Sequence, residues 1–79
     1  ATADPPTAAT LLDAAMRIDP VNEDLHRRAM RAHAAAGQPD RIAPLLQGLT
    51  ARLAELDEEP DPDTEQLAWH LHGGPHGHH

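Results

Sequence analysis

Apolar residues recur along this chain at steps of three and four, the spacing that gathers side chains on one face of an α-helix. The first run comprises Leu11, Leu12, Ala15 and Ile18. It predicts a helix with Thr7 as its N-cap, because a threonine hydroxyl can accept a hydrogen bond from a backbone N–H of the first turn. Asp19-Pro20 is expected to end this helix, because the residue before a proline is disfavoured in the helical conformation.

A second helix is predicted after this turn. Asn22 is its expected N-cap, and Glu23 and Asp24 stand in its first turn, where the positive end of the helix dipole favours acids. Its apolar stripe is narrow and mostly made of small side chains, Leu25, Ala29, Ala32 and Ala36. Gly37 follows the stripe and is expected to end the helix in the left-handed conformation. The small side chains indicate that another helix approaches this face closely.

The third helix has the best amphipathic pattern, with apolar residues at Ile42, Leu45, Leu46, Leu49, Leu53 and Leu56. The connection before it, Gln38-Pro39-Asp40, is short, so the second and third helices should pack antiparallel. Pro44 is tolerated only in the first turn, where its missing N–H has no helical partner. Gly48 weakens the middle of the helix, which indicates either a close neighbour or a kink.

Acidic residues concentrate between positions 55 and 65. This stretch is either a surface for a basic protein partner or a solvated helix end followed by a hinge. Within it, Asp61-Pro62 combines an N-cap with a proline at the first helical position, which predicts a short fourth helix that ends at Gly73-Gly74. That helix is expected to turn Leu67, Ala68 and Leu71 inward, with Trp69 nearby.

These runs predict an all-α fold: antiparallel helical hairpins of tetratricopeptide-like type, with three main helices and a short C-terminal helix. Residues 1–6 are expected to be a flexible linker, 7–72 the helical domain and 73–79 a disordered Gly/His tail. The first residues lack an initiator Met and the regions of a signal peptide, so we expect the chain to be a piece of a longer protein.

The charge of the chain narrows the class of partner. Thirteen acids against six basic residues, all of them arginine, give a net charge of −7. This charge opposes direct binding to nucleic acid, where neutralisation of phosphates supplies most of the affinity, and it disfavours anionic membrane surfaces. No apolar run approaches the roughly 20 residues that cross a bilayer. The absence of cysteine fits a reducing compartment, and we expect the chain to be cytoplasmic.

Seven histidines are the first candidates for chemistry. Five of them lie near the C-terminus, at His70, His72, His76, His78 and His79. They are either ligands of a transition metal or a soluble tail; the tail is favoured, because no cysteine or ordered carboxylate completes a tetrahedral set. His26 and His33 lie on the second helix without a nucleophile beside them, so they are interpreted as histidines at the core edge or the surface.

The arginines and the tryptophan allow two interpretations each. Arg27, Arg28 and Arg31 either contact phosphate or pair with Glu23 and Asp24 one turn earlier, and pairing is favoured in an acidic chain. Trp69 either anchors an interface or packs on the third helix. The sequence contains no nucleophile elbow, phosphate loop or zinc-protease motif. We therefore predict no catalytic, cofactor-binding or metal-binding residues, no cofactor and no enzymatic activity.

Several segments resemble the bacterial transcriptional activator domain, a helical domain of tetratricopeptide-like build found in antibiotic-pathway regulators. They are Leu11-Leu12, Asp19-Pro20, Met30-Arg31-Ala32, Ala36-Gly37, Leu53-Ala54-Glu55 and, most specifically, Glu59-Pro60-Asp61-Pro62-Asp63-Thr64. The similarity spans roughly residues 8–72 and corresponds to the C-terminal half of such a domain. Two positions depart from the family: Leu46 replaces a usual aromatic residue, and Leu56-Asp57 replaces a usual Leu-Gly.

This resemblance implies a non-catalytic protein–protein interaction module in transcription regulation, which mediates oligomerisation of a regulator or contact with a partner. Any DNA contact would belong to a winged helix outside this chain. A stack that lacks its neighbouring repeat should leave Leu11, Leu12 and Ile18 uncovered. Two alternatives stay open: a free-standing tetratricopeptide-like adaptor unrelated to transcription, and a metal-handling protein that works through the histidine tail. No small-molecule substrate is evident, and the sequence does not identify the partner or the signal.

Overall fold

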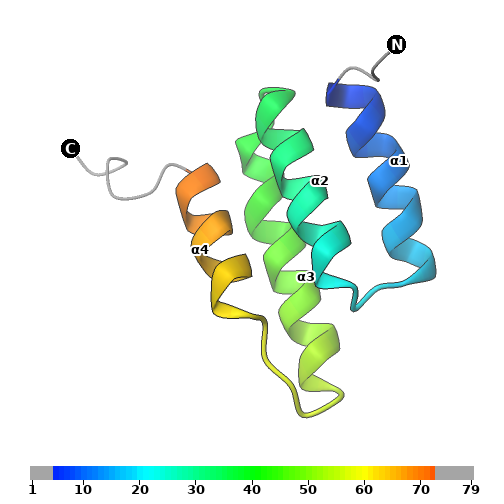
Figure 1. Ribbon diagram of the computed structural model, residues 1–79, viewed down its shortest axis with the longest axis vertical. Coiled ribbons are helices and arrows are strands. Elements are labelled where there is room, and N and C mark those ends of the chain that lie inside the picture. Colours follow the sequence, from blue (N-terminus) through cyan, green and yellow to red (C-terminus); the bar gives the residue numbers. More distant parts are fainter. Residues whose placement is uncertain (1–4, 73–79) are drawn as a thin grey trace.

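The computed structural model describes residues 5–72, and all regular structure in this range is helical. The elements are α1 (Pro5–Ile18), α2 (Glu23–Ala35), the short 3₁₀ helix η1 (Pro39–Arg41), α3 (Ile42–Ala54) and α4 (Pro62–Leu71). The four α-helices of this range alternate in direction, so that each runs antiparallel to the one before it (Figure 1). The predicted all-α fold with three main helices and a short fourth is confirmed.

The start of α1 differs from the prediction. The helix begins at Pro5, inside the range expected to be linker, so Thr7 lies within its first turn and is not its N-cap. The physical reason is that proline suits the first turn, where its fixed φ is helical and its missing N–H has no partner to lose. Residues 1–4 and 73–79 lie outside the described residues, so the predictions of a linker and a tail there stay predictions.

Both ends of α2 are as predicted. The Asn22 side chain accepts a hydrogen bond from the Leu25 backbone N–H at 3.1 Å. At the other end Gly37 has a φ of 77°, and the Gln38 N–H donates to the His33 carbonyl at 2.8 Å. This 6→1 bond across a left-handed residue is the Schellman closure that glycine favours. Local sequence chemistry therefore fixes the length of α2.

The predicted short connection is η1, and Pro44 lies in the first turn of α3 as expected. Leu56 lies beyond the end of α3, although its spacing placed it on the helix. A Cβ added at Gly48 meets nothing within 4 Å, so the interpretation of a close neighbour at this glycine is wrong. Gly48 is instead an exposed helical position with open space around it.

The end of α3 explains one departure from the family pattern. Asp57 has a φ of 59°, the left-handed conformation that favours glycine. The Glu58 N–H donates to the Leu53 carbonyl at 2.9 Å, and the Asp57 N–H donates to the Ala54 carbonyl at 3.0 Å. This is a second Schellman closure, made here by an aspartate at the position where the family usually has glycine.

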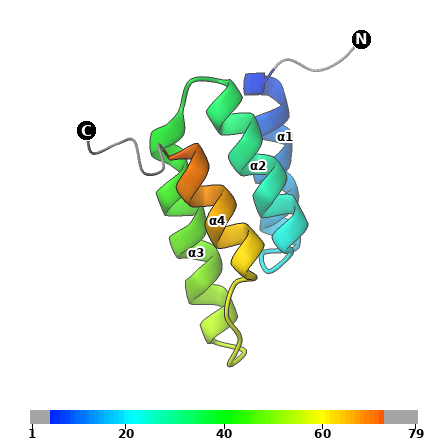
Figure 2. The same ribbon diagram turned by 60° about the vertical axis from the view of Figure 1, so that its left-hand side comes forward.

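The core lies among α2, α3 and α4, with α1 packed on α2 (Figure 2). Its central side chains are Met30, Ile42 and Ala68, one from each of the three helices. Four half-buried apolar residues surround them, Ala34, Leu45, Leu46 and Leu71. The predicted inward face of α4 is confirmed at Ala68, and Leu67 and Leu71 are half-buried. The fully buried Thr64 on the same helix was not predicted.

The buried face of α2 is offset from the predicted stripe. The buried residues are His26, Ala29, Met30 and His33, at helical spacing, and only Ala29 belongs to the predicted set. Leu25, Ala32 and Ala36 are half-buried. The prediction differs because histidine counts as polar in a hydrophobic pattern, whereas His26 and His33 flank the buried Met30 on this face.

Candidate functional site

The outer face of α1 carries exposed apolar side chains. Leu11 is 62% exposed and Ile18 is 87% exposed, and Ala14 between them is also exposed. Steps of three and four residues join these positions, so they form one stripe along the helix, which we call the α1 stripe (Leu11, Ala14 and Ile18). The prediction that Leu11 and Ile18 are uncovered is confirmed, whereas Leu12 is half-buried. Apolar side chains in such a row are available to another protein surface.

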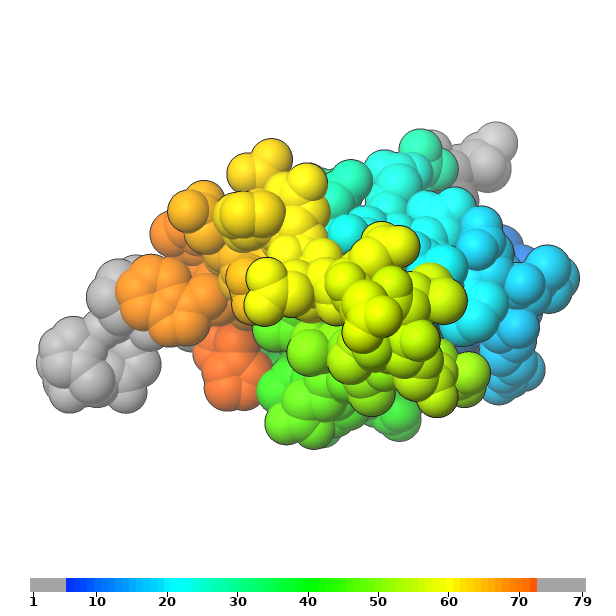
Figure 3. Space-filling view, turned by 90° about the horizontal axis from the view of Figure 1, so that it is seen from below, coloured from blue at the N-terminus to red at the C-terminus, as the bar shows by residue number. Residues whose placement is uncertain are grey.

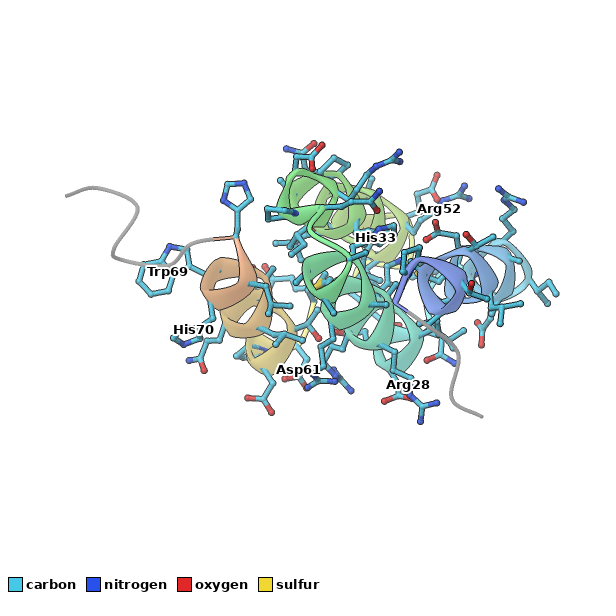
Figure 4. The ribbon with its side chains drawn as sticks, turned by 90° about the horizontal axis from the view of Figure 1, so that it is seen from above. Arg28, His33, Arg52, Asp61, Trp69 and His70 are labelled. Atoms are coloured by element: carbon cyan, nitrogen blue, oxygen red, sulfur yellow. The ribbon has the colours of Figure 1, made fainter. Side chains whose placement is uncertain are left out.

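A second apolar surface lies between α3 and α4. An open groove there is lined by Ile42, Ala43, Leu46, Glu65, Ala68, Trp69 and His72. Trp69 is 56% exposed at the edge of this groove and points away from the bundle (Figure 4). Trp69 lines this groove together with Ile42, Ala43 and Leu46 of α3, so its packing on α3 is partial and more than half of its surface stays in contact with solvent. Its role as an interface anchor stays a prediction.

A hydrogen-bonded network joins α2 to the beginning of α4. The Thr64 hydroxyl donates to Glu23 Oε1 at 2.8 Å and accepts from Arg27 Nη1 at 2.8 Å. Glu23 Oε1 also accepts from the Asp61 backbone N–H at 2.8 Å. One carboxylate oxygen thus receives two donors from α4 and its cap, and the buried hydroxyl connects a carboxylate with a guanidinium. The network fixes where α4 begins relative to α2.

Two of the three arginines of α2 bind different partners. Arg28 pairs with Asp24 at 2.9 Å, which confirms the expected intrahelical ion pair. Arg27 differs from the prediction, because its hydrogen bond within the described residues runs to Thr64 on α4. The difference arises because Glu23, the expected partner of Arg27, is occupied by donors of α4.

The two histidines of α2 have structural partners. His26 Nδ1 donates to the Asn22 carbonyl at 2.9 Å, and the side chain is buried. His33 is buried between two elements: its Nε2 lies 3.3 Å from Asp13 Oδ1 on α1, and its Nδ1 lies 3.0 Å from the Gln38 side-chain oxygen. His33 thus joins α1 to the loop after α2. Burial of His26 and His33 agrees with the interpretation of histidines at the core edge and contradicts the surface alternative.

The histidine tail lies mostly outside the described residues. His70 and His72 are exposed at the end of α4, and His76, His78 and His79 fall in the range 73–79. Within residues 5–72, no group of three or more histidine, aspartate or glutamate side chains is placed to hold a metal ion. The choice between a metal-binding and a soluble tail is not tested by the described part of the chain.

The acidic stretch, residues 55–65, covers the turn between α3 and α4 and the first turn of α4. Asp61 caps α4 as predicted, because its Oδ1 accepts from the Asp63 N–H at 2.9 Å. The acidic side chains of residues 55–65 are exposed, whereas Pro60 is buried. Exposure of this kind agrees with a solvated helix end and hinge. It also leaves the carboxylates free of the core and within reach of another molecule.

Comparison with known proteins supports the resemblance seen in the sequence. The family model of the bacterial transcriptional activator domain matches residues 4–71. No curated protein and no solved structure matches the chain. Among the described residues, no helix has the length and apolar character needed to span a membrane.

Proposed function

This chain belongs to the bacterial transcriptional activator domain family, and we propose that it acts as a non-catalytic protein–protein interaction module. The family relates the chain to transcription regulation. In our proposal the module binds a second copy or another protein in the bacterial cytoplasm, and this contact is relayed to a regulatory or DNA-binding domain elsewhere. Contact with DNA by this chain itself is disfavoured by its net charge of −7.

The α1 stripe is the observation that supports this proposal. Leu11 and Ile18 together leave most of their surface in water, on a helix whose own buried side chains, Ala9 and Met16, lie outside the central cluster of α2, α3 and α4. Full burial of one Leu or Ile side chain contributes about 1.5–3 kcal/mol. Two such residues give roughly 3–6 kcal/mol, which reaches only the lower end of the roughly 4–15 kcal/mol cost of association. The stripe alone therefore supports weak binding, and tighter binding needs neighbouring polar contacts.

The test compares self-association of the full chain with that of a surface variant. In Leu11→Asp/Ile18→Asp two charges interrupt the α1 stripe, and both positions are exposed, so the fold should persist in far-UV circular dichroism. Ala51→Asp places a similar charge on an exposed position of α3 and is the matched control. Sedimentation velocity from about 10 μM to about 1 mM should show association of the wild type and the control, and a monomer for the variant.

Two results would contradict the proposed role of α1. The first is a variant that associates as strongly as the wild type. The second is a wild-type chain that stays monomeric throughout this range and binds no apolar dye such as ANS. The role of the α1 stripe in binding another protein is tested separately. A fragment of the parent regulator that binds the wild type and the variant with equal affinity would contradict that role.

A further inference from the structure

A groove with positively charged walls runs between α1 and α3. It consists of two adjoining hollows of about 360 and 270 Å³, which share Asp13, Arg17, Pro44 and Leu45. Three of the six arginines of the chain line it: Arg17 on α1, Arg41 just before α3 and Arg52 in the last turn of α3. Figure 4 shows Arg52 and His33 on the side of the bundle where α1 faces α3.

The charge of this groove is opposite to that of the whole chain. Asp13 is the single acid among its described lining residues, and that carboxylate already contacts the buried His33. Arg17, Arg41 and Arg52 are all exposed, and none forms an ion pair with an acid within residues 5–72. In a chain of net charge −7, three unpaired guanidinium groups along one groove favour an anionic ligand.

The dimensions of the groove favour a peptide segment over a small anion. Arg41 and Arg52 are separated by eleven positions, which corresponds to about 16 Å at 1.5 Å per helical residue. A single phosphate or carboxylate cannot reach both. Between the arginines the lining includes the apolar side chains Met16, Pro20, Pro44 and Leu45. The ligand should therefore carry several acidic side chains and at least one apolar side chain.

The turn after α3 has this chemistry. Residues 55–59, here called the acidic turn, combine four acids with Leu56, which is 54% exposed. The turn projects beyond the ends of α1 and α2 (Figure 1), and it forms a knob in the space-filling view from below (Figure 3). The two hydrogen bonds of the Schellman closure at Asp57 hold its backbone in place. Little conformational entropy is then lost when it binds.

We propose that the groove between α1 and α3 binds the acidic turn of a second copy of this chain. Leu56 meets the apolar lining, and Glu58 and Glu59 meet the exposed guanidinium groups of Arg17 and Arg52. This proposal rests on the interaction function proposed above and names a partner and a surface for it. Because Arg52 and the acidic turn belong to the same end of α3, two copies related by a two-fold axis exchange turns and satisfy both grooves.

The test uses charge reversal in trans. The groove variant is Arg17→Glu/Arg52→Glu, and the turn variant is Glu58→Arg/Glu59→Arg; all four side chains are exposed, so both variants should fold. Each variant alone juxtaposes like charges and should self-associate at least about tenfold more weakly than the wild type in sedimentation velocity. An equimolar mixture restores opposite charges at both contacts, and its dimer should return to within about threefold of the wild-type affinity.

The control matches the charge change away from the groove. Arg28→Glu/Arg31→Glu alters the net charge as the groove variant does, but neither side chain lines the groove. The control and the groove variant carry the same net charge, so general repulsion weakens both equally. The control should nevertheless self-associate with clearly higher affinity than the groove variant. Raising the salt concentration from about 0.05 to about 0.5 M should weaken the wild-type dimer, because exposed charges are screened.

Four results would overturn the proposal. They are a wild type that stays monomeric at about 1 mM, a mixture no more associated than its components, a control as weak as the groove variant, and binding of duplex DNA lost only in the groove variant. Failure here is distinguishable from failure of the proposed function. If Leu11→Asp/Ile18→Asp abolishes association while the charge variants associate as the wild type does, the α1 stripe stands and the groove does not.

Discussion

Removal of the Thr64 hydroxyl should destabilise the domain more than removal of its methyl group. Thr64 is fully buried, and its hydroxyl lies 2.8 Å from both Glu23 Oε1 and Arg27 Nη1. Thr64→Val keeps the shape of the side chain and deletes only the polar atom. The carboxylate and the guanidinium then face a methyl group where each had a hydrogen bond.

The magnitude follows from the two bonds that are lost. A hydrogen bond to a charged group contributes about 1.5–3 kcal/mol to stability. Glu23 and Arg27 are half-buried, so water replaces part of each lost bond, and we expect Thr64→Val to cost about 2 kcal/mol in total. Thr64→Ser keeps both bonds and loses one methyl group, which costs about 1 kcal/mol. In a domain of this size 2 kcal/mol lowers the melting temperature by about 8–16 °C.

The assay is equilibrium unfolding in urea and by heat, followed by two probes. Far-UV circular dichroism reports all the helices, and the fluorescence of Trp69 reports α4, five residues after Thr64. Coincident transitions indicate that α4 unfolds with the domain, whereas an earlier fluorescence transition indicates that α4 detaches first. A Thr64→Val variant within about 0.5 kcal/mol of the wild type, or no more destabilised than Thr64→Ser, would refute the importance of the network.

Three further substitutions test local features by the same unfolding assays. Asp57→Gly should be about 1 kcal/mol more stable than Asp57→Ala, because position 57 has a φ of 59° and only glycine adopts it without strain; equal stability contradicts this. Gly48→Ala should stabilise the domain by up to about 1 kcal/mol, since its Cβ meets nothing within 4 Å, and a loss of stability would argue against that space. Asp13→Ala should lower the stability by about 1–3 kcal/mol, because it leaves the buried His33 Nε2 unpaired. The same substitution in a His33→Leu variant should have almost no effect on stability.

Features that depend on near neighbours in sequence could be predicted. Asn22, Gly37 and Asp61 end or begin helices through hydrogen bonds that span two to five residues, and all three were identified from the sequence. The start of α1 differs from the prediction because prolines near a chain end are typical of a linker, although proline is equally suited to a first helical turn. The sequence shows Asp57 as a departure from the family pattern, but its left-handed conformation follows only from the backbone.

Features that depend on distant partners could not be predicted. Thr64 is buried because Glu23 and Arg27 reach it from 41 and 37 residues away. His33 is buried because Asp13 satisfies it across the α1–α2 interface. No periodicity in the sequence marks a polar side chain that will find such a partner. The exposure of Leu11 and Ile18 could be predicted because a missing neighbour follows from repeat architecture, whereas Leu12 is half-buried and the groove lined by Arg17 and Arg52 arises from the way α1 lies beside α3.

The position of α1 in the fold leads to a last prediction, about local stability. The central core of Met30, Ile42 and Ala68 contains no residue of α1. The helix packs mainly on α2, through the buried Ala9 and Met16, the half-buried Ala8, Leu12 and Ala15, and the contact of Asp13 with His33. Local unfolding is least costly where few buried apolar contacts hold an element. We therefore expect native-state hydrogen exchange to show lower protection for the central amides of α1 than for those of α2 and α3.

This difference in protection connects stability with binding. A partner or a second copy on the α1 stripe buries Leu11 and Ile18. Because it binds α1 only when the helix is folded, it raises the free energy of local unfolding of α1 by mass action. Protection of the α1 amides should therefore rise with protein concentration in the wild type and stay constant in Leu11→Asp/Ile18→Asp. Equal protection of α1, α2 and α3 at low concentration would contradict the weak attachment of α1. A chain that associates while its α1 amides gain no protection would show that association uses another surface, because α1 unfolds less readily when a molecule is bound on the α1 stripe.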